Sequence, residues 1–230
     1  MSTPPIRIQC PFSMKESVCE QAARILFLNI AWVKDISSLS LLSMEDQLVI
    51  LEASWRDLFL LSASQCYPPF DPTPIVTAEM QMDLPSELVK NLALEVKRFK
   101  DIIDTVGNFQ LDQFEYNCAK SMVLYKAILD IDSAPSSNSS TGSMSPGISR
   151  LKDPSLVLSL KENAQNTLCT KMATSGAYGP LRYSKFLMTL SNLKEVSPKM
   201  IEELFFRRAI GPSTSIDKVI CDVYTRQSIH

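Results

Sequence analysis

Histidine is almost absent from this chain of 230 residues, and the single one, His230, is the last residue. Nucleophilic pairs of the Cys–His or Ser–His kind and histidine-based zinc sites therefore have almost no material here. Neighbouring acids, such as Glu202 with Glu203 and Asp101 with Asp104, fall where solvated helix faces are expected, so they do not indicate a catalytic carboxylate pair. We expect neither an enzyme nor a cofactor or metal site.

Clusters of positive charge are also missing. The formal net charge is -2, whereas a protein that binds nucleic acid by itself neutralises phosphates with grouped Lys and Arg. No apolar stretch is long enough to span a membrane, and residues 1 to 12 lack the charged start and apolar core of a signal peptide. We therefore expect a domain that neither enters a membrane nor contacts DNA on its own.

Close cysteine pairs are the third absence. The six cysteines are widely scattered, no CxxC spacing occurs, and most of them fall inside helical patterns. This distribution is typical of reduced, buried thiols in an intracellular protein rather than of a disulfide framework or a zinc module. The residues concerned are Cys10, Cys19, Cys66, Cys118, Cys169 and Cys221.

The sequence does contain one helical pattern after another. Apolar residues at helical spacing predict a first helix over residues 16–34, and later helices follow Pro85, Asp112 and the pair Asp153–Pro154. Two more helices are expected near the C-terminus, the second of them ended by Gly211. The only β structure that we expect is a short hairpin among the Pro-rich residues 68–82. The pattern thus predicts an all-α domain.

The length permits one large domain or two small ones, and one large domain would bury about 70 to 75 per cent of its unfolded surface. Residues 132–150 are rich in Ser, Gly, Pro and Asn, a composition that buries too little apolar area to offset its ordering entropy. We interpret this stretch as a flexible loop, because neither flank looks self-sufficient. We expect a flexible segment over residues 1–15 and a single domain over residues 16–230.

A central helix is expected to begin next to Ser43. Its hydroxyl is followed three residues later by Asp46, which is the order of a capping box, and acids suit the positive end of a helix. From residue 48 to residue 63 the apolar residues no longer keep to one face, as in a helix sandwiched between others. Periodicity alone would favour an ordinary core helix with a capped start.

The order of residues around this helix is more specific than its periodicity. Trp32, Lys34, the pair Asp46–Gln47 and Trp55 resemble, in order and spacing, the signature of the nuclear receptor ligand-binding domain. The resemblance extends over residues 17–224 and is strongest for the tailless and photoreceptor-specific orphan receptors, with the tailless branch favoured. It implies a three-layer antiparallel helical sandwich.

The resemblance also implies a function. These receptors are nuclear transcription factors, mainly repressors, and this chain would be their regulatory domain only. It would reach DNA through a DNA-binding domain that this chain lacks. The alternative is a non-receptor helical adaptor or a carrier of a hydrophobic ligand, with an enzyme much less favoured.

A coregulator groove is the first site that the resemblance implies. A partner helix lays apolar anchors into such a groove, while a lysine, here Lys34, favours the negative end of the helix dipole. The expected partners are corepressor peptides, which the family suggests are of the atrophin type. The groove residues carried over from the family are Phe27, Ile30, Lys34, Leu39, Gln47, Leu48 and Leu51.

A ligand pocket is the second implied site. Retinoid-binding relatives place an arginine at the position of Cys66, where it grips the ligand carboxylate, so an acidic retinoid is disfavoured here. A hydrophobic small molecule remains a candidate partner, and the sequence leaves open whether the pocket is empty, filled by side chains or liganded. The residues implied to border it are Val18, Gln21, Ala22, Ile25, Trp55, Phe59, Ala63 and Cys66.

The C-terminal residues predict a short helix over residues 216–225, because apolar residues recur at helical offsets there. A helix of about ten residues is marginal alone, so it must dock or fray. It could be a packing helix or a switch, and the resemblance implies an activation helix able to occupy its own groove. Many relatives have Glu where this chain has the shorter Asp222, which argues against conventional coactivator clamping. The activation-helix residues are Val219, Ile220, Asp222, Val223 and Tyr224.

Self-association is the last implied property. Residues 181–187 resemble the long dimerisation helix of the family, and two-fold pairing would place one apolar stripe against its own copy. We therefore expect a homodimer. Its expected face consists of Tyr183, Phe186, Leu187 and Leu190.

Overall fold

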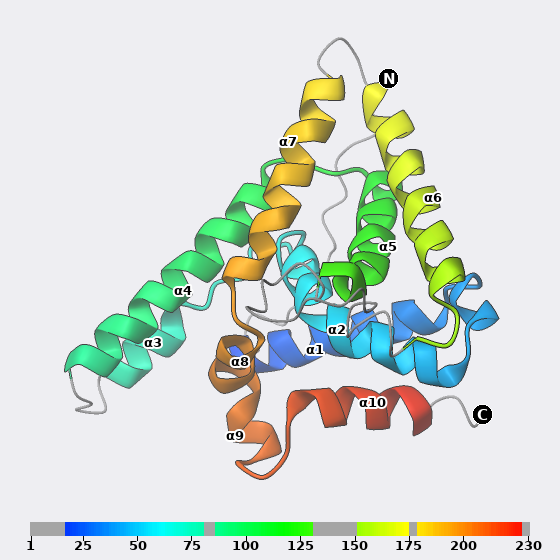
Figure 1. The fold of residues 1–230 in the computed structure, drawn as a ribbon. Coiled ribbons are helices and arrows are strands. Elements are labelled where there is room, and N and C mark those ends of the chain that lie inside the picture. Colours follow the sequence, from blue (N-terminus) through cyan, green and yellow to red (C-terminus); the bar gives the residue numbers. More distant parts are fainter. Residues whose placement is uncertain (1–16, 81–85, 131–150, 175–178, 227–230) are drawn as a thin grey trace, which may run out of the picture.

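The computed structural model describes residues 17–80, 86–130, 151–174 and 179–226, and it confirms the expected all-α class (Figure 1). The flexible segments expected at residues 1–15 and 132–150 lie outside the described residues. The α-helices are α1 (Val18–Lys34), α2 (Met44–Ala63), α3 (Thr73–Met80), α4 (Ser86–Gly107), α5 (Gln113–Asp130), α6 (Pro154–Ala173), α7 (Gly179–Asn192), α8 (Pro198–Ile201), α9 (Arg207–Ile210) and α10 (Ile216–Arg226). Short turns named η1 (Leu39–Leu41), η4 (Leu193–Glu195) and the π-helical η5 (Glu202–Phe206) join some of them.

Helix α1 begins at a complete capping box. The Ser17 hydroxyl accepts a hydrogen bond from the backbone N–H of Glu20 at 3.3 Å, and the Glu20 carboxylate accepts one from the backbone N–H of Ser17 at 2.7 Å. Ala22, Ile25 and Ile30 are buried on one face, at the spacing from which the helix was predicted. The start of α1 is therefore fixed by hydrogen bonds between residues within its first turn.

Helix α2 is the centre of the molecule. It contacts α1, α4, α5 and α10, as expected of a helix that is apolar all round (Figure 1). The Ser43 hydroxyl caps it by accepting from the backbone N–H of Asp46 at 3.2 Å. The Asp46 carboxylate is fully buried, and it accepts from the backbone N–H groups of Lys152 and Asp153 at 2.8 and 3.1 Å. Asp46, in the first turn of α2, therefore anchors the start of α6.

The hairpin expected among residues 68–82 is wrong, because residues 73–80 form helix α3. Asp71 holds the chain just before this helix, where its carboxylate accepts from the backbone N–H and the hydroxyl of Thr73 at 3.1 and 2.6 Å. Pro74 lies in the first turn, where a missing N–H costs no helical hydrogen bond. Prolines that suggest strand edges thus belong to a helix start.

The remaining helices start and stop mostly where local signals place them. Asp153 caps α6 by accepting from the backbone N–H of Leu156 at 3.0 Å, and Pro154 is its first residue. Gly211 follows α9 with a φ of 76°, a conformation that suits glycine. Gly179 is required by a close approach, because a Cβ atom there would lie 2.2 Å from the carbonyl oxygen of Met172.

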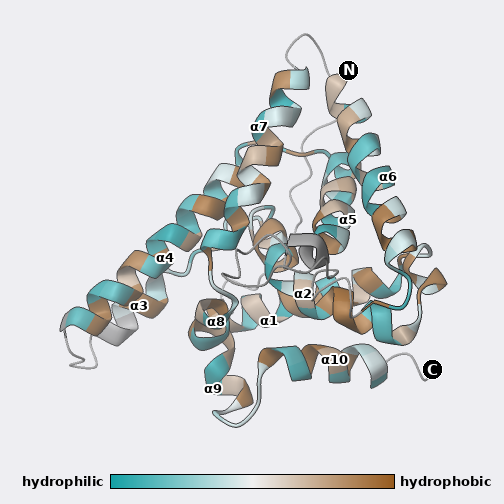
Figure 2. Cartoon of the chain, viewed as in Figure 1, coloured by the Kyte–Doolittle hydropathy of each residue, from teal (hydrophilic) through white to brown (hydrophobic). Residues whose placement is uncertain are grey.

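The apolar faces turn toward a common core, and several helices alternate between hydrophobic and hydrophilic turns along their length (Figure 2). Helix α10 runs along one side of the molecule, next to α1 and α2 (Figure 1). Within the described ranges, none of the helices combines the length and apolar character required to cross a membrane.

Candidate coregulator groove

The structure brings the expected groove residues together along the contact between α1 and α2. Ile30 and Leu51 are buried, and so is Leu39, which lies in η1 between the two helices. Lys34 is half-buried at the last turn of α1, whereas Phe27 is 47% exposed. Gln47 and Leu48 are half-buried on the first turns of α2.

Helix α10 packs against α1 and α2, the two helices that carry most of the expected groove residues (Figure 1). Ile216, Ile220 and Tyr224 form its buried stripe, at a spacing of four residues. Val219 and Val223 are half-buried beside this stripe, and Asp222 is exposed. Of the apolar residues expected to pack into the groove, Ile220 is therefore the central one.

Tyr224 connects the C-terminal end of α10 to the groove. Its hydroxyl donates a hydrogen bond to the Gln47 side-chain oxygen at 2.6 Å, and the Lys34 ammonium lies 5.0 Å from its ring centroid. This distance is within the range of a cation–π interaction. Burial lowers the pKa of Lys34 and raises the pKa of Tyr224. The lysine that would meet a partner helix thus already meets the tail.

Trp55 connects the other end of α10 to α2. Its indole N–H donates to the Asp217 carboxylate at 2.7 Å. Burial raises the pKa of Asp217; the hydrogen bond from Trp55 opposes this shift, and the carboxylates of Glu52 and Glu202 add to it. This attachment was not predicted from the sequence, where Trp55 was expected to border the ligand pocket and Asp217 was given no role.

The expected pocket residues are mostly part of the closed core. Ala22, Ile25, Trp55 and Ala63 are at most 4% exposed, and Phe59 is fully buried. The Phe59 ring lies with its centroid 5.8 to 6.3 Å from four other phenyl rings, those of Phe70, Phe99, Phe205 and Phe206. These distances are typical of packed aromatic pairs. Side chains of the domain itself therefore fill the space around Phe59.

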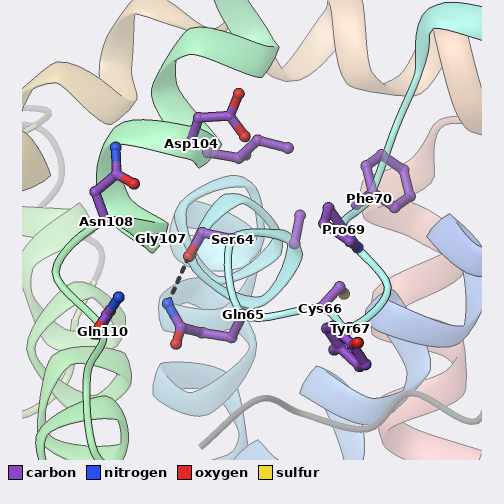
Figure 3. Close-up of a pocket in the computed structure, with 12 residues that line it drawn as sticks. Ser64, Gln65, Cys66, Tyr67, Pro69, Phe70, Asp104, Gly107, Asn108 and Gln110 are labelled. Carbon is purple, nitrogen blue, oxygen red and sulfur yellow. Dashed lines mark hydrogen bonds between the residues drawn. The ribbon is translucent and has the colours of Figure 1, made fainter. Parts of the chain in front are cut away.

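A cavity of about 480 Å³ lies beyond Phe70, where α2 ends and α4 ends (Figure 3). Only Ala63 and Cys66 of the expected pocket residues line it. Gln65 and Ser64 are joined there by a hydrogen bond of 3.0 Å. A second cavity, of about 580 Å³, opens between α1, α3, α4 and η5, and it includes Val18.

The family model for the ligand-binding domain of nuclear hormone receptors matches residues 8–210. The chain belongs to this family. Its members are nuclear transcription regulators and not enzymes. Among the described residues there is no group of three or more His, Cys, Asp and Glu that could hold a metal ion.

Several curated nuclear receptors are similar to the chain. The protein tailless of Drosophila virilis is 30% identical over 229 residues, which are 95% of this chain and 51% of that protein. Human nuclear receptor subfamily 2 group F member 6 is 30% identical over 210 residues, 90% of this chain and 47% of that receptor. Seven-up of Drosophila melanogaster has the same identity over the same length, 35% of that receptor. The chain spans about half the length of the first two relatives.

In this ligand-binding domain, the helix expected to dimerise is α7, and its apolar residues divide between two faces. Phe186 and Leu190 are buried inside the protomer, where the Phe186 ring packs against that of Phe109 at 5.1 Å. Tyr183 and Leu187 are half-buried. The outward surface of α7 also includes Met188, which is 72% exposed. A dimer face on α7 would therefore be narrower than the sequence suggested.

Proposed function

We propose that this domain represses transcription by recruiting corepressor helices through a coregulator groove that its own tail helix gates. The observation that supports this most is the pair of contacts that Tyr224 makes with Gln47 and Lys34. A partner helix would need these two side chains, so it must compete with α10 for them. The resting domain would then recruit no coactivator.

Occupation of the groove by α10 would lower the apparent affinity of a peptide that binds there. If the groove is free in only a fraction of the molecules, the apparent affinity of a groove-binding peptide falls by that fraction. A groove that is free about 1% of the time would weaken binding about 100-fold. The side chain of Asp222 is one methylene shorter than the glutamate of many relatives, which further disfavours the conventional clamping of a coactivator helix.

The proposed partners are corepressor helices, of the atrophin type suggested by the tailless-like sequence. The proposal includes a homodimer formed through α7, and DNA binding through a domain outside this chain. The filled space around Phe59 favours a receptor that acts without a ligand in that space, although the cavity next to Val18 offers room for a hydrophobic molecule. Family membership removes the support for a non-receptor adaptor or carrier.

The test is a side-by-side titration with fluorescent peptides, one derived from atrophin and one containing LxxLL. The full chain of 230 residues is used, and fluorescence anisotropy reports binding. We expect the atrophin-derived peptide to bind more tightly than the LxxLL peptide. Tighter binding of the LxxLL peptide would contradict the repressor function.

A further inference from the structure

The chain between α8 and α10 contains a π-helical turn that does not follow from the sequence pattern. In η5, the backbone N–H of Arg207 donates to the carbonyl oxygen of Glu202, five residues earlier. π-turns of this kind are rare and frequent at functional sites. Glu202 is the first residue of this turn and Arg207 directly follows it. Both residues contact the segment that leads into α10.

Glu202 contacts the first residue of the tail helix. Glu202 is only 9% exposed, and its carboxylate accepts a hydrogen bond from the backbone N–H of Ile216 at 3.3 Å. The other carboxylate oxygen forms an ion pair with Arg207. The first N–H groups of a helix have no partner within the helix, and a negative charge there is favourable. Glu202 therefore stabilises α10 at one fixed starting point.

Arg207 holds the rest of the connection. One nitrogen of its guanidinium group donates to the carbonyl oxygens of Gly211 at 2.8 Å and Thr214 at 3.1 Å. The others donate to the carboxylates of Glu202 and Glu203, the latter at 3.0 and 3.1 Å. A planar guanidinium group with several donors can fix carbonyls and carboxylates in one relative arrangement, which a lysine cannot do equally well.

We propose that Arg207 and Glu202 are the positioning residues that direct the tail helix into the coregulator groove. They lie outside the groove and touch no groove residue through the contacts described above. They act on α10 by fixing where it starts and how the segment from Gly211 to Ser215 approaches it. The inference rests on the proposed function, in which the docked α10 closes the groove.

The physical reason is the cost of ordering. A helix of eleven residues is marginal on its own, and docking it from a free connection requires ordering both the helix and the connection. The contacts of Arg207 and Glu202 order the connection in advance, so docking α10 costs less conformational entropy. Without them, the same apolar contacts of Ile216 and Ile220 hold the helix for a smaller fraction of the time.

The experiment compares Arg207→Gln with Arg208→Gln in the full chain. Both substitutions remove one positive charge from α9, but Arg208 lines the cavity beside α3, whereas Arg207 donates to the carbonyls of the connection. Glu202→Gln is the second variant, because it keeps the size of the side chain. Amide hydrogen exchange of residues 216–226 is measured by mass spectrometry without any peptide, and circular dichroism checks the helical content.

We expect exchange in residues 216–226 to become about tenfold faster or more in Arg207→Gln and in Glu202→Gln, the range expected from losing hydrogen bonds to charged groups. Arg208→Gln should match the wild type. Unchanged exchange in Arg207→Gln, or an equal increase across α2, would overturn the positioning role. If the tail is released but the LxxLL peptide binds no better, the positioning role stands and the closed-groove function fails.

Discussion

At the scale of single residues, Tyr224 is the residue that connects the tail helix to the expected groove residues. It is 3% exposed and meets both Gln47 and Lys34. A polar side chain buried by docking must be hydrogen-bonded, otherwise its desolvation opposes docking. The hydroxyl of Tyr224 therefore contributes to the choice of the docked position, and its ring contributes apolar contact.

Tyr224→Phe tests this contribution. The substitution keeps the ring over Lys34 but removes the hydrogen bond to Gln47, which is worth about 0.5 to 1.5 kcal/mol. We expect an LxxLL peptide to bind about two- to tenfold more tightly, because the groove is free more often. Tyr67→Phe, which changes an exposed tyrosine, is the control and should leave the affinity unchanged. Weaker peptide binding in Tyr224→Phe would argue that the hydroxyl serves the partner and not the tail.

Lys120 is a second residue whose environment has a measurable consequence. It is 5% exposed on α5, and its ammonium lies 3.9 Å from the ring centroid of Trp32 and 5.5 Å from that of Tyr116. Burial lowers the pKa of Lys120 to about 7. In the unfolded chain the same pKa is about 10.4. The folded state therefore binds this proton less tightly than the unfolded state does.

The sign of the pH dependence follows from this difference. Between about pH 7 and pH 10 the unfolded chain holds the proton and the folded chain releases it, so stability from this residue rises with pH, by at most about 1.4 kcal/mol per unit. We expect Lys120→Met to be more stable than the wild type at pH 6, with a gap that narrows by pH 9. Urea unfolding at several pH values measures this gap. A gap that stays constant with pH would show that the ammonium remains charged in the fold.

At the scale of secondary-structure elements, α10 differs from the other helices in how it is held. It has one buried stripe and three polar attachments, at Ile216, Asp217 and Tyr224. Helix α2, by contrast, is buried along most of its length. Elements with few buried contacts open at lower free energy than the core does. The tail helix can therefore leave while the rest of the domain stays folded.

Ile220→Ala should show this difference. Removing a buried large aliphatic side chain costs about 2 to 5 kcal/mol in a well-packed site, and here the loss falls on the docking of α10. We expect hydrogen exchange to rise in residues 216–224 and to stay unchanged in residues 48–63. Lys218→Ala, on the exposed face of the same helix, should have little effect. An equal rise in both segments would mean that the tail is part of the core.

At the scale of the whole molecule, the proposed homodimer depends on which side chains of α7 face outward. Helix α7 packs with one face on α4 and α6, which buries Phe186 and Leu190. Leu187 remains half-buried, close enough to the surface to meet a copy of itself across a two-fold axis. Packing inside the protomer would thus use some residues of the apolar stripe, and packing between two protomers would use others.

Leu187→Arg tests the pairing, because a two-fold axis would place two new charges in one interface. We expect the wild type to be a dimer at tens of micromolar, where an interface of about 8 kcal/mol assembles, and the variant to be a monomer. Light scattering measures the mass and circular dichroism checks the helices. Asn91→Arg, on the exposed side of α4, should leave the dimer intact. A wild type that stays monomeric at this concentration would remove the homodimer from the proposed function.

Prediction from the sequence succeeded where the decisive contacts are local. The starts of α1, α2 and α6 depend on Ser17, Ser43 and Asp153, each of which accepts from an N–H three residues later. The receptor signature was also recognisable, because it lies within one stretch of the chain. The prediction of a hairpin was wrong, because proline signals a break in the chain without specifying which element follows it.

The sequence by itself determined most of the helices and the family, and it predicted a set of groove residues. Only the tertiary structure decided that α10 packs on α1 and α2, that Phe186 turns inward, and that phenyl rings fill the space around Phe59. These rings come from α4, from η5 and from the segment between α2 and α3. The contacts responsible join residues far apart, 177 positions for Tyr224 and Gln47 and 162 for Trp55 and Asp217. Such contacts form only because the packing of the intervening helices brings their partners together. A local pattern of residues therefore cannot predict them.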